Sequence, residues 1–141
     1  MANYWDMGMS PVPFVADTDL TAKQFLLVSP ASTAGNVGFP TSACNPIPVG
    51  ILVNDPSAGQ AAAVVIFGPV KAKCRVTTCY LVNGKYLKAA SDGFLEPLTS
   101  ATTEFAIARY FDGRQTTVDA SVLGNVFIMG ISSCGLQLGT S

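Results

Sequence analysis

The sequence contains no histidine and few charged side chains. Histidine is the commonest general base and the commonest zinc ligand, so its absence removes every Ser-His and Cys-His nucleophile pair and argues against an enzyme. Charged residues make up 12% of the 141 residues, while apolar residues make up 49%. A protein with so little charge usually buries much of its surface against a partner. A monomer whose surface is covered by Ser, Thr, Asn and Gly residues is the alternative.

The chain also lacks the features that attract nucleic acid or a membrane. Its formal net charge is −1, so no electrostatic footprint for nucleic acid is present. The longest apolar run, residues 61–67, is far shorter than the roughly 20 residues of a membrane-spanning helix. Asp6, Pro11 and Pro13 stand where a signal peptide needs basic residues and an unbroken apolar run. We therefore expect no nucleic-acid or membrane partner, and synthesis in a reducing cytoplasm.

No catalytic, metal or cofactor motif is present, and we expect no cofactor. The glycines follow neither the phosphate-loop nor the dinucleotide pattern. Asp17 and Asp19 lie on one strand face beside a predicted strand start, where acids are usually solvated. The other acidic pairs lie in or beside turns, where solvation is expected rather than a hydrolase site: Asp92 and Glu96, Asp112 and Asp119. The four cysteines lack zinc-site spacing, and buried free thiols are favoured over a disulfide: Cys44, Cys74, Cys79 and Cys134.

What the sequence does contain is a loose internal repeat at an offset of 56 positions. The matching pairs are Leu20 with Val76, Phe25 with Leu81, Ile51 with Ile107, Gly68 with Gly124, and Val70 with Val126. Repeats decide the architecture of a domain. We therefore predict a single β domain over residues 16–141 with two pseudo-repeats, about 16–72 and 73–130, that share one core, and a tail at 131–141.

Short apolar segments separated by turn residues predict an all-β fold, either a barrel or a sandwich. The predicted strands are residues 24–28, 49–53, 61–67, 70–76, 80–82, 86–88, 105–111, 116–123 and 126–131. Asn83-Gly84 is a strong hairpin signal. Residues 29–48 are expected to form a long loop, and residues 57–63 either a short helix or part of a strand. The tail is either an edge strand or a loose end.

Residues 1–15 are predicted to form an extended N-terminal arm, because Pro11 and Pro13 favour extended neighbours. The arm is rich in the aromatic and Met side chains that are enriched in interface cores. Its candidate partner-binding residues are Tyr4, Trp5, Met7, Met9, Val12 and Phe14. Docking of the arm on the body of the same chain is an equally open alternative.

A second candidate for partner binding is the alternating run Lys71, Lys73 and Arg75, which would share one face of a strand. Such a run usually forms a solvated face or protects a sheet edge. Contact with an acidic partner surface is the functional alternative.

Two strings carry a family resemblance. Residues 48–60 (Pro-Val-Gly-Ile-Leu-Val-Asn-Asp-Pro-Ser-Ala-Gly-Gln), followed by residues 64–70 (Val-Val-Ile-Phe-Gly-Pro-Val), resemble the small tailed-phage capsid decoration or cement proteins. A second copy over residues 105–126 keeps the strands and Gly124, but has Asp112-Gly113-Arg114 in place of the Ala-Gly turn. The resemblance covers about residues 15–130.

The resemblance implies a compact β-tulip or barrel-like fold and a homotrimer without catalytic activity. It also implies a location on the outer surface of an icosahedral virion head, where the protein binds the major capsid protein and stabilises the head against packed DNA. Addition of the arm as a strand to a shell protein is the mechanism we expect. The alternative is a carbohydrate- or receptor-binding module of a virion fibre or surface layer, with candidate residues Phe94, Tyr80, Tyr86, Tyr110 and Phe111.

Overall fold

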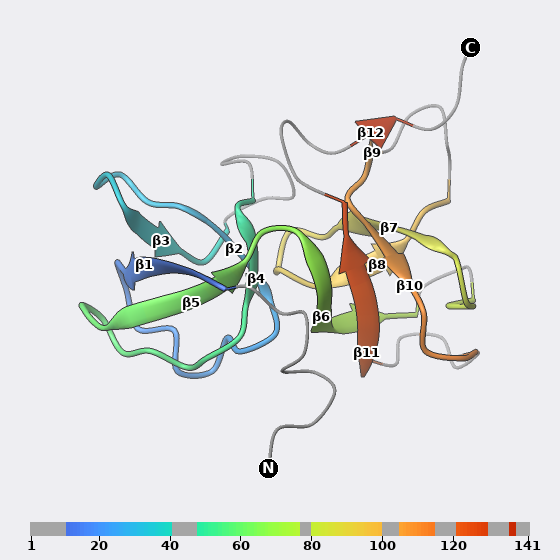
Figure 1. Cartoon of the computed structure of the whole chain (residues 1–141), viewed down its shortest axis with the longest axis horizontal. Helices are drawn as coiled ribbons and strands as arrows, with labels where there is room; N and C mark the ends of the chain where they lie inside the picture. The colour runs from blue at the N-terminus through green and yellow to red at the C-terminus, as the bar shows by residue number, and fades with distance from the viewer. Residues whose placement is uncertain are drawn as a thin grey trace.

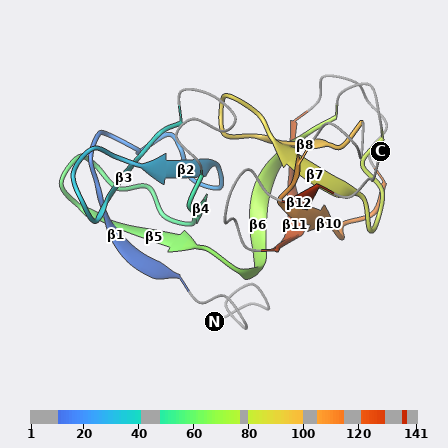
Figure 2. The same ribbon diagram turned by 90° about the horizontal axis from the view of Figure 1, so that it is seen from above.

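The computed structural model describes residues 11–40, 48–76, 80–99, 105–114, 121–129 and 136–137. Among these residues every regular element is a β-strand, which confirms the predicted all-β class (Figure 1). The strands close into two five-stranded barrels that lie side by side along the long axis of the molecule (Figure 2). No helix that could span a membrane occurs in this described part of the chain.

The first barrel is built from the N-terminal half of the chain. Its strands are β1 (Val12–Ala16), β2 (Leu27–Pro30), β3 (Asn36–Gly38), β4 (Gly50–Leu52) and β5 (Ala61–Val65). Around the barrel they follow the order β1-β3-β2-β4-β5, and β5 closes the ring by pairing with β1. The β1–β3 pair is parallel and the other pairs are antiparallel.

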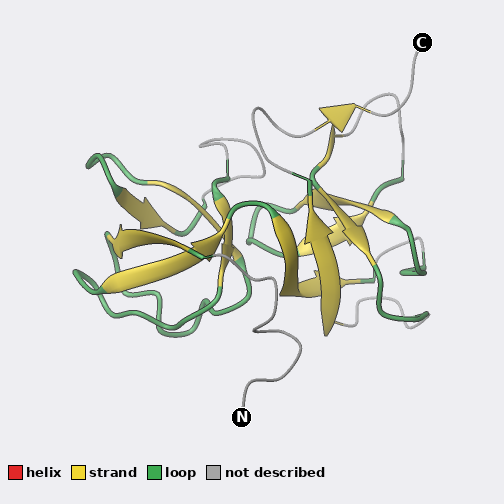
Figure 3. Ribbon diagram, viewed as in Figure 1, coloured by secondary structure: helices red, strands yellow, loops and turns green. Residues whose placement is uncertain are grey.

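The second barrel follows after a two-residue link, Ile66-Phe67. Its strands are β6 (Gly68–Arg75), β7 (Tyr86–Ala89), β8 (Leu95–Pro97), β10 (Ala108–Tyr110) and β11 (Ser121–Ile128). They follow the order β6-β8-β7-β10-β11, and β11 closes on β6. Beside this barrel a two-stranded sheet pairs β9 (Phe105–Ala106) with β12 (Leu136–Gln137), near the top of Figure 3.

The two barrels have the same topology, so the internal repeat is visible in the structure. In each barrel the first strand pairs in parallel with the third and antiparallel with the fifth. The offset differs from the expected 56 positions, because Cys74 pairs with Leu95 as Ala16 pairs with Val37, 58 positions earlier. Val70 and Val126, which the 56-position offset treats as equivalent, are instead cross-strand partners within the second barrel.

One apolar core extends through both barrels. Leu27, Ile51 and Val65 of the first barrel belong to the same buried cluster as the inward side chains of β6, β7, β10 and β11. A second cluster, which includes Leu20 and Val37, fills the rest of the first barrel. Since apolar burial contributes about 25 cal/mol per Å², burial in this continuous core stabilises the packing of the two barrels against each other.

Backbone hydrogen bonds and one unusual residue also join the barrels. The Leu27 N–H donates to the Gly93 carbonyl at 2.9 Å, and the Lys73 N–H donates to the Phe25 carbonyl at 2.8 Å. Phe25 has a positive φ of 67°, a conformation that costs a non-glycine residue on the order of 1–3 kcal/mol. The chain bends there, which is why the strand predicted from residue 24 begins only at Leu27.

Other boundaries also differ from the sequence-based prediction. The expected loop at 29–48 contains β3, and the region expected to offer a helix or a strand contributes β5. The predicted arm extended to residue 15, whereas β1 already begins at Val12. Around residues 80–82 the described structure has only a single bridge, at Leu81, before the Asn83-Gly84 turn. The expected break near Gly124 is absent because β11 continues through it, paired with β6 along its whole length.

Candidate functional site: interaction surfaces of the two barrels

The described part of the predicted arm is a strand of the first barrel. Val12 pairs with Val64 and Phe14 with Ala62, and the Phe14 side chain packs against the core of this barrel. These two candidate residues therefore contribute to the chain's own body. The remaining arm candidates, Tyr4, Trp5, Met7 and Met9, lie outside the described residues.

The basic run lies on the outer face of the second barrel. Along β6, Val70, Ala72 and Cys74 point into the core, while Lys71, Lys73 and Arg75 point outward. Because β6 pairs with β11 along its whole length, the lysines do not protect a free edge on that side. The cross-strand partner of Lys73 is Leu123, whose side chain is 46% exposed. We call the surface formed by Lys71, Lys73 and Leu123 on β6 and β11 the basic ribbon face.

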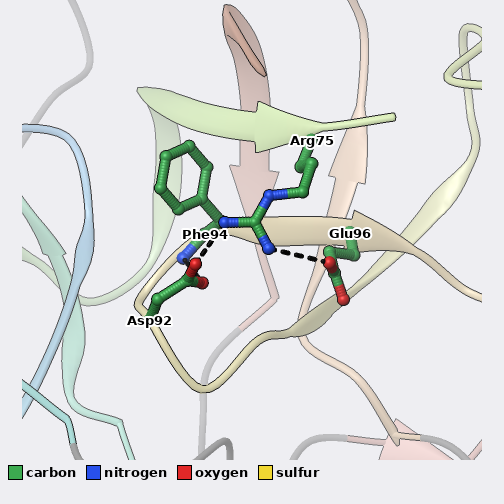
Figure 4. A network of polar contacts seen from close by, with 4 residues as sticks. All are labelled: Arg75, Asp92, Phe94 and Glu96. Carbon is green, nitrogen blue, oxygen red and sulfur yellow. Dashed lines mark hydrogen bonds and ion pairs between the residues drawn. The ribbon is translucent and has the colours of Figure 1, made fainter. Parts of the chain in front are cut away.

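Arg75 differs from the two lysines because carboxylates of the same barrel balance its charge (Figure 4). Its guanidinium donates to Asp92 and, at 3.2 Å, to Glu96, and it stacks on the Phe94 ring with 4.3 Å to the centroid. The hydrogen bond to Asp92, followed by the nearby carboxylate charges, raises the pKa of Arg75. This group ties β6 to the segment that contains β8, so Arg75, Phe94 and the two acids have structural roles.

A third surface lies where the turns before β7 and after β10 meet. Tyr80 and Phe111 are 52% and 48% exposed. The Arg114 guanidinium lies 4.5 Å from the Tyr80 ring centroid, and the Arg109 guanidinium lies between Tyr86 and Phe111, 5.0 and 5.3 Å from their centroids. We call these five residues the arginine–aromatic end. Exposed Tyr and Arg side chains are typical of binding hot spots.

Hydrogen bonds hold the backbone of the arginine–aromatic end in place. The Gly84 N–H donates to the Tyr110 carbonyl at 2.6 Å, and the Gly113 N–H donates to the Asn83 side-chain oxygen at 2.8 Å. The buried Tyr110 hydroxyl donates to the Asp112 carbonyl at 3.1 Å. Tyr110 therefore belongs to the core, unlike the other aromatic candidates around it. The exposed rings are presented by a well-connected pair of turns.

The arginines of this end lack the acids that accompany Arg75. Among the described residues no carboxylate forms an ion pair with Arg109 or Arg114, and the buried Arg109 Nε has no hydrogen-bond acceptor. Sequence reasoning singled out Tyr80, Tyr86 and Phe111 but missed both arginines. Their position at the two ends of the segment 109–114, which contains Tyr110 and Phe111, was the available signal, but only the fold brings Tyr80 and Tyr86 beside them.

The remaining candidate groups that the structure describes are a buried thiol and two hydrogen-bonded aspartates. Cys74 is a buried free thiol whose pKa is raised to about 12, first by burial and second by the charge of Asp112. The other three cysteines lie outside the described residues. Asp17 accepts a hydrogen bond from the Asn36 side chain, and Asp19 from the Thr21 N–H. Within the described ranges, no three His, Cys, Asp or Glu side chains are grouped to hold a metal ion.

Comparison with known proteins gives a likeness of fold. No protein-family model matches the sequence, and no curated protein sequence is similar to it. The structure is similar to the crystal structure of the N base of the head fibre protein gp8.5 from bacteriophage phi29, with a TM-score of 0.56 and 15% sequence identity. The match covers 85% of this chain and 93% of that chain, so it includes both barrels rather than one. At this identity the likeness establishes a shared fold.

Proposed function

We propose that this chain is a structural protein of a bacteriophage head that binds the outer surface of the icosahedral shell as a homotrimer and stabilises it. The observation that carries the proposal is the fold likeness to a head fibre base over 85% of the chain. The sequence strings at residues 48–70 support it separately, because they resemble capsid decoration proteins. The role is non-enzymatic, in keeping with a chain that contains no histidine.

The basic ribbon face is the described surface that best fits a shell contact. Lys73 and Leu123 lie opposite each other on β6 and β11, so one patch offers both a positive charge and an apolar side chain. Positive charge speeds association with an acidic shell surface and fixes its orientation, while apolar burial supplies affinity. The N-terminal residues Tyr4, Trp5, Met7 and Met9 are the further anchors that we propose.

The test is co-sedimentation of the purified chain with heads of the phage that encodes it, prepared without this protein. We expect saturable binding, and a higher temperature for DNA release from decorated heads. Deletion of residues 2–10 and the change Lys73→Glu should each weaken binding. Lys23→Glu is a matched control, since it makes the same charge change in the other barrel, where the Lys23 ammonium lies 4.2 Å from the Phe39 ring centroid. A folded wild-type chain that does not sediment with heads would contradict the proposal.

A second candidate function is a receptor- or carbohydrate-binding module of a virion fibre. The observation that favours it is the exposure of Tyr80 and Phe111 beside Arg114 and Arg109, because aromatic faces stack on sugar rings and arginine binds carboxylates. A glycan array probed with wild type and with Tyr80→Ala/Phe111→Ala tests it. Binding that is lost in the variant would favour this function. No binding above background by the wild type would reject it.

A further inference from the structure

Charge is distributed unequally between the two halves of the chain. Residues 1–65 contain one basic residue, Lys23, and four acidic residues, whereas residues 66–141 contain seven basic and five acidic residues. The halves therefore carry formal charges of −3 and +2, which account for the net charge of −1. A molecule with opposite charges on its two barrels is electrostatically complementary to copies of itself.

The negative charge of the first barrel gathers at one end. Asp17 and Asp19 follow β1 and Asp55 lies between β4 and β5, and all three are exposed. The Leu20 N–H donates to the Pro56 carbonyl at 2.9 Å, so these two acidic segments lie side by side. We call the three aspartates the acidic end. No ion pair neutralises it among the residues that the structure describes.

The arginine–aromatic end lies in the other barrel. The segments that follow β1 and join β4 to β5 run along the lower side of the first barrel, in the left half of Figure 1, and the turns before β7 and after β10 lie at its right. The molecule thus has a negative surface on one barrel and a positive surface on the other. The positive end also presents the exposed rings of Tyr80 and Phe111.

Comparison of the three stacked arginines shows what the positive end lacks. Arg75 stacks on Phe94 and has two carboxylates, Asp92 and Glu96, at the edge of its guanidinium. Arg109 and Arg114 stack in the same way, but the described residues supply no carboxylate to them. A ring covers only the face of a guanidinium, so the N–H edge of the exposed Arg114 stays available for a carboxylate from another molecule.

We propose that a second copy of this chain supplies these carboxylates: the acidic end of one copy binds the arginine–aromatic end of the next, with Asp55 and Arg114 at the centre of the contact. The contact joins two different surfaces, so it propagates from copy to copy until the ring closes. This inference rests on the proposed homotrimer for its closure at three copies. An acidic glycan and an acidic shell surface are the competing occupants of the arginine–aromatic end.

The test is the mass of the full chain in solution by light scattering, without heads, at about 0.05 M and about 1 M salt. The wild type should form a species of about 44 kDa, three times 14.6 kDa, that dissociates at high salt, where the screening length falls to about 3 Å. Arg114→Glu and Asp55→Lys should each raise the dissociation constant at least about tenfold. Lys23→Glu is the control because it makes a charge reversal outside both ends, where the Lys23 ammonium lies 4.2 Å from the Phe39 ring centroid.

The swapped chain, Asp55→Lys with Arg114→Glu, is the decisive variant, because it restores opposite charges across the contact. Recovery of the wild-type mass supports the proposal. A monomeric wild type, an Arg114→Glu chain that remains associated, or a swapped chain that stays monomeric would overturn it. If the wild type is monomeric and Arg114→Glu abolishes only glycan or head binding, the competing occupant is correct. Head binding is measured separately, so a monomer that still sediments with heads refutes this contact but not the proposed function.

Discussion

The second barrel closes tightly around Gly124, and this closure gives a quantitative prediction. Gly124 lies on β11 opposite Ala72, in the middle of the strand, and faces the buried ring of Tyr110. A Cβ atom added at Gly124 would lie 2.5 Å from Cε1 of Tyr110 and 3.4 Å from two further ring atoms. Since the ring is 1% exposed and protein cores are close-packed, either the ring or β11 must shift at a cost in stability.

Gly124→Ala should therefore destabilise the protein by about 1–3 kcal/mol, the usual cost of overpacking a core. For a chain of this size the change lowers the melting temperature by roughly 3–6 °C per kcal/mol. Guanidinium unfolding followed by far-UV circular dichroism measures the free energy of unfolding directly. In a Tyr110→Leu background the same Gly124→Ala change should cost less than about 0.5 kcal/mol, because the ring that it strikes is gone.

Gly38→Ala is the control for this prediction. Gly38 lies on β3 and has no positive φ, and a methyl group added to it would meet no other atom within 4 Å. Alanine there should be neutral or stabilising by up to about 1 kcal/mol, because it restricts the unfolded chain. Equal losses at Gly38 and Gly124, or an unchanged Gly124→Ala protein, would refute the close packing of Gly124 against Tyr110.

Further predictions concern the N-terminus, the Arg75 group and the buried thiol. Deletion of residues 2–10 should leave the free energy of unfolding unchanged. Deletion of residues 2–13 should lower the free energy of unfolding by at least about 2 kcal/mol, because it removes Val12 and its pairing with Val64. Equal free energies of unfolding for the two deletions would contradict the assignment of β1. Arg75→Met should lower the free energy of unfolding by about 1–2 kcal/mol, and high salt should reduce part of this loss, because the ion pairs with Asp92 and Glu96 are partly exposed. A loss within error of zero would show that this group adds no stability. In a variant whose other cysteines are serine, Cys74 should react with a thiol reagent only after unfolding, and rapid native-state labelling would contradict its burial. Because the pKa of Cys74 in the folded protein is raised to about 12, the stability that Cys74 contributes is fully present below pH 9 and is lost as pH rises from 9 to 12. If the difference in unfolding free energy between wild type and Cys74→Ala does not change over that pH range, the pKa shift is wrong.

The sequence predicted β6 from alternation along a long strand and β4 from a short buried apolar run. The pattern from Val70 to Val76 predicted β6 and the outward placement of Lys71 and Lys73, because alternation along a strand is a local property. Val49 to Val53 likewise predicted β4. Both segments combine β-branched residues with clear turn signals at their ends.

Besides β1, which begins inside the predicted arm, the strands that sequence reasoning missed are β3 and β8. Each has three residues in a region rich in Gly, Pro or polar side chains, and each is the third strand of its barrel. Both pair in parallel with the first strand, so distant residues rather than local preference define them. The same limit hid the arginine–aromatic end and the partners of Arg75, because neighbours that come from different segments of one barrel leave no trace in local spacing.

The offset of the repeat was misjudged for a related reason. Loops of different length separate equivalent strands, so no single offset aligns the two halves, and chance matches within β6 and β11 favoured 56 positions. Pairing registers correct this, since the parallel bridges of the two barrels are 58 positions apart.

The most direct test of the central proposal is electron cryo-microscopy of heads that lack this protein, imaged before and after incubation with the purified chain. We predict added density of about three 14.6 kDa copies at repeated positions on the outer shell surface, into which the two-barrel fold fits with the basic ribbon face toward the shell. Heads that show no added density after incubation with a folded chain would contradict the account.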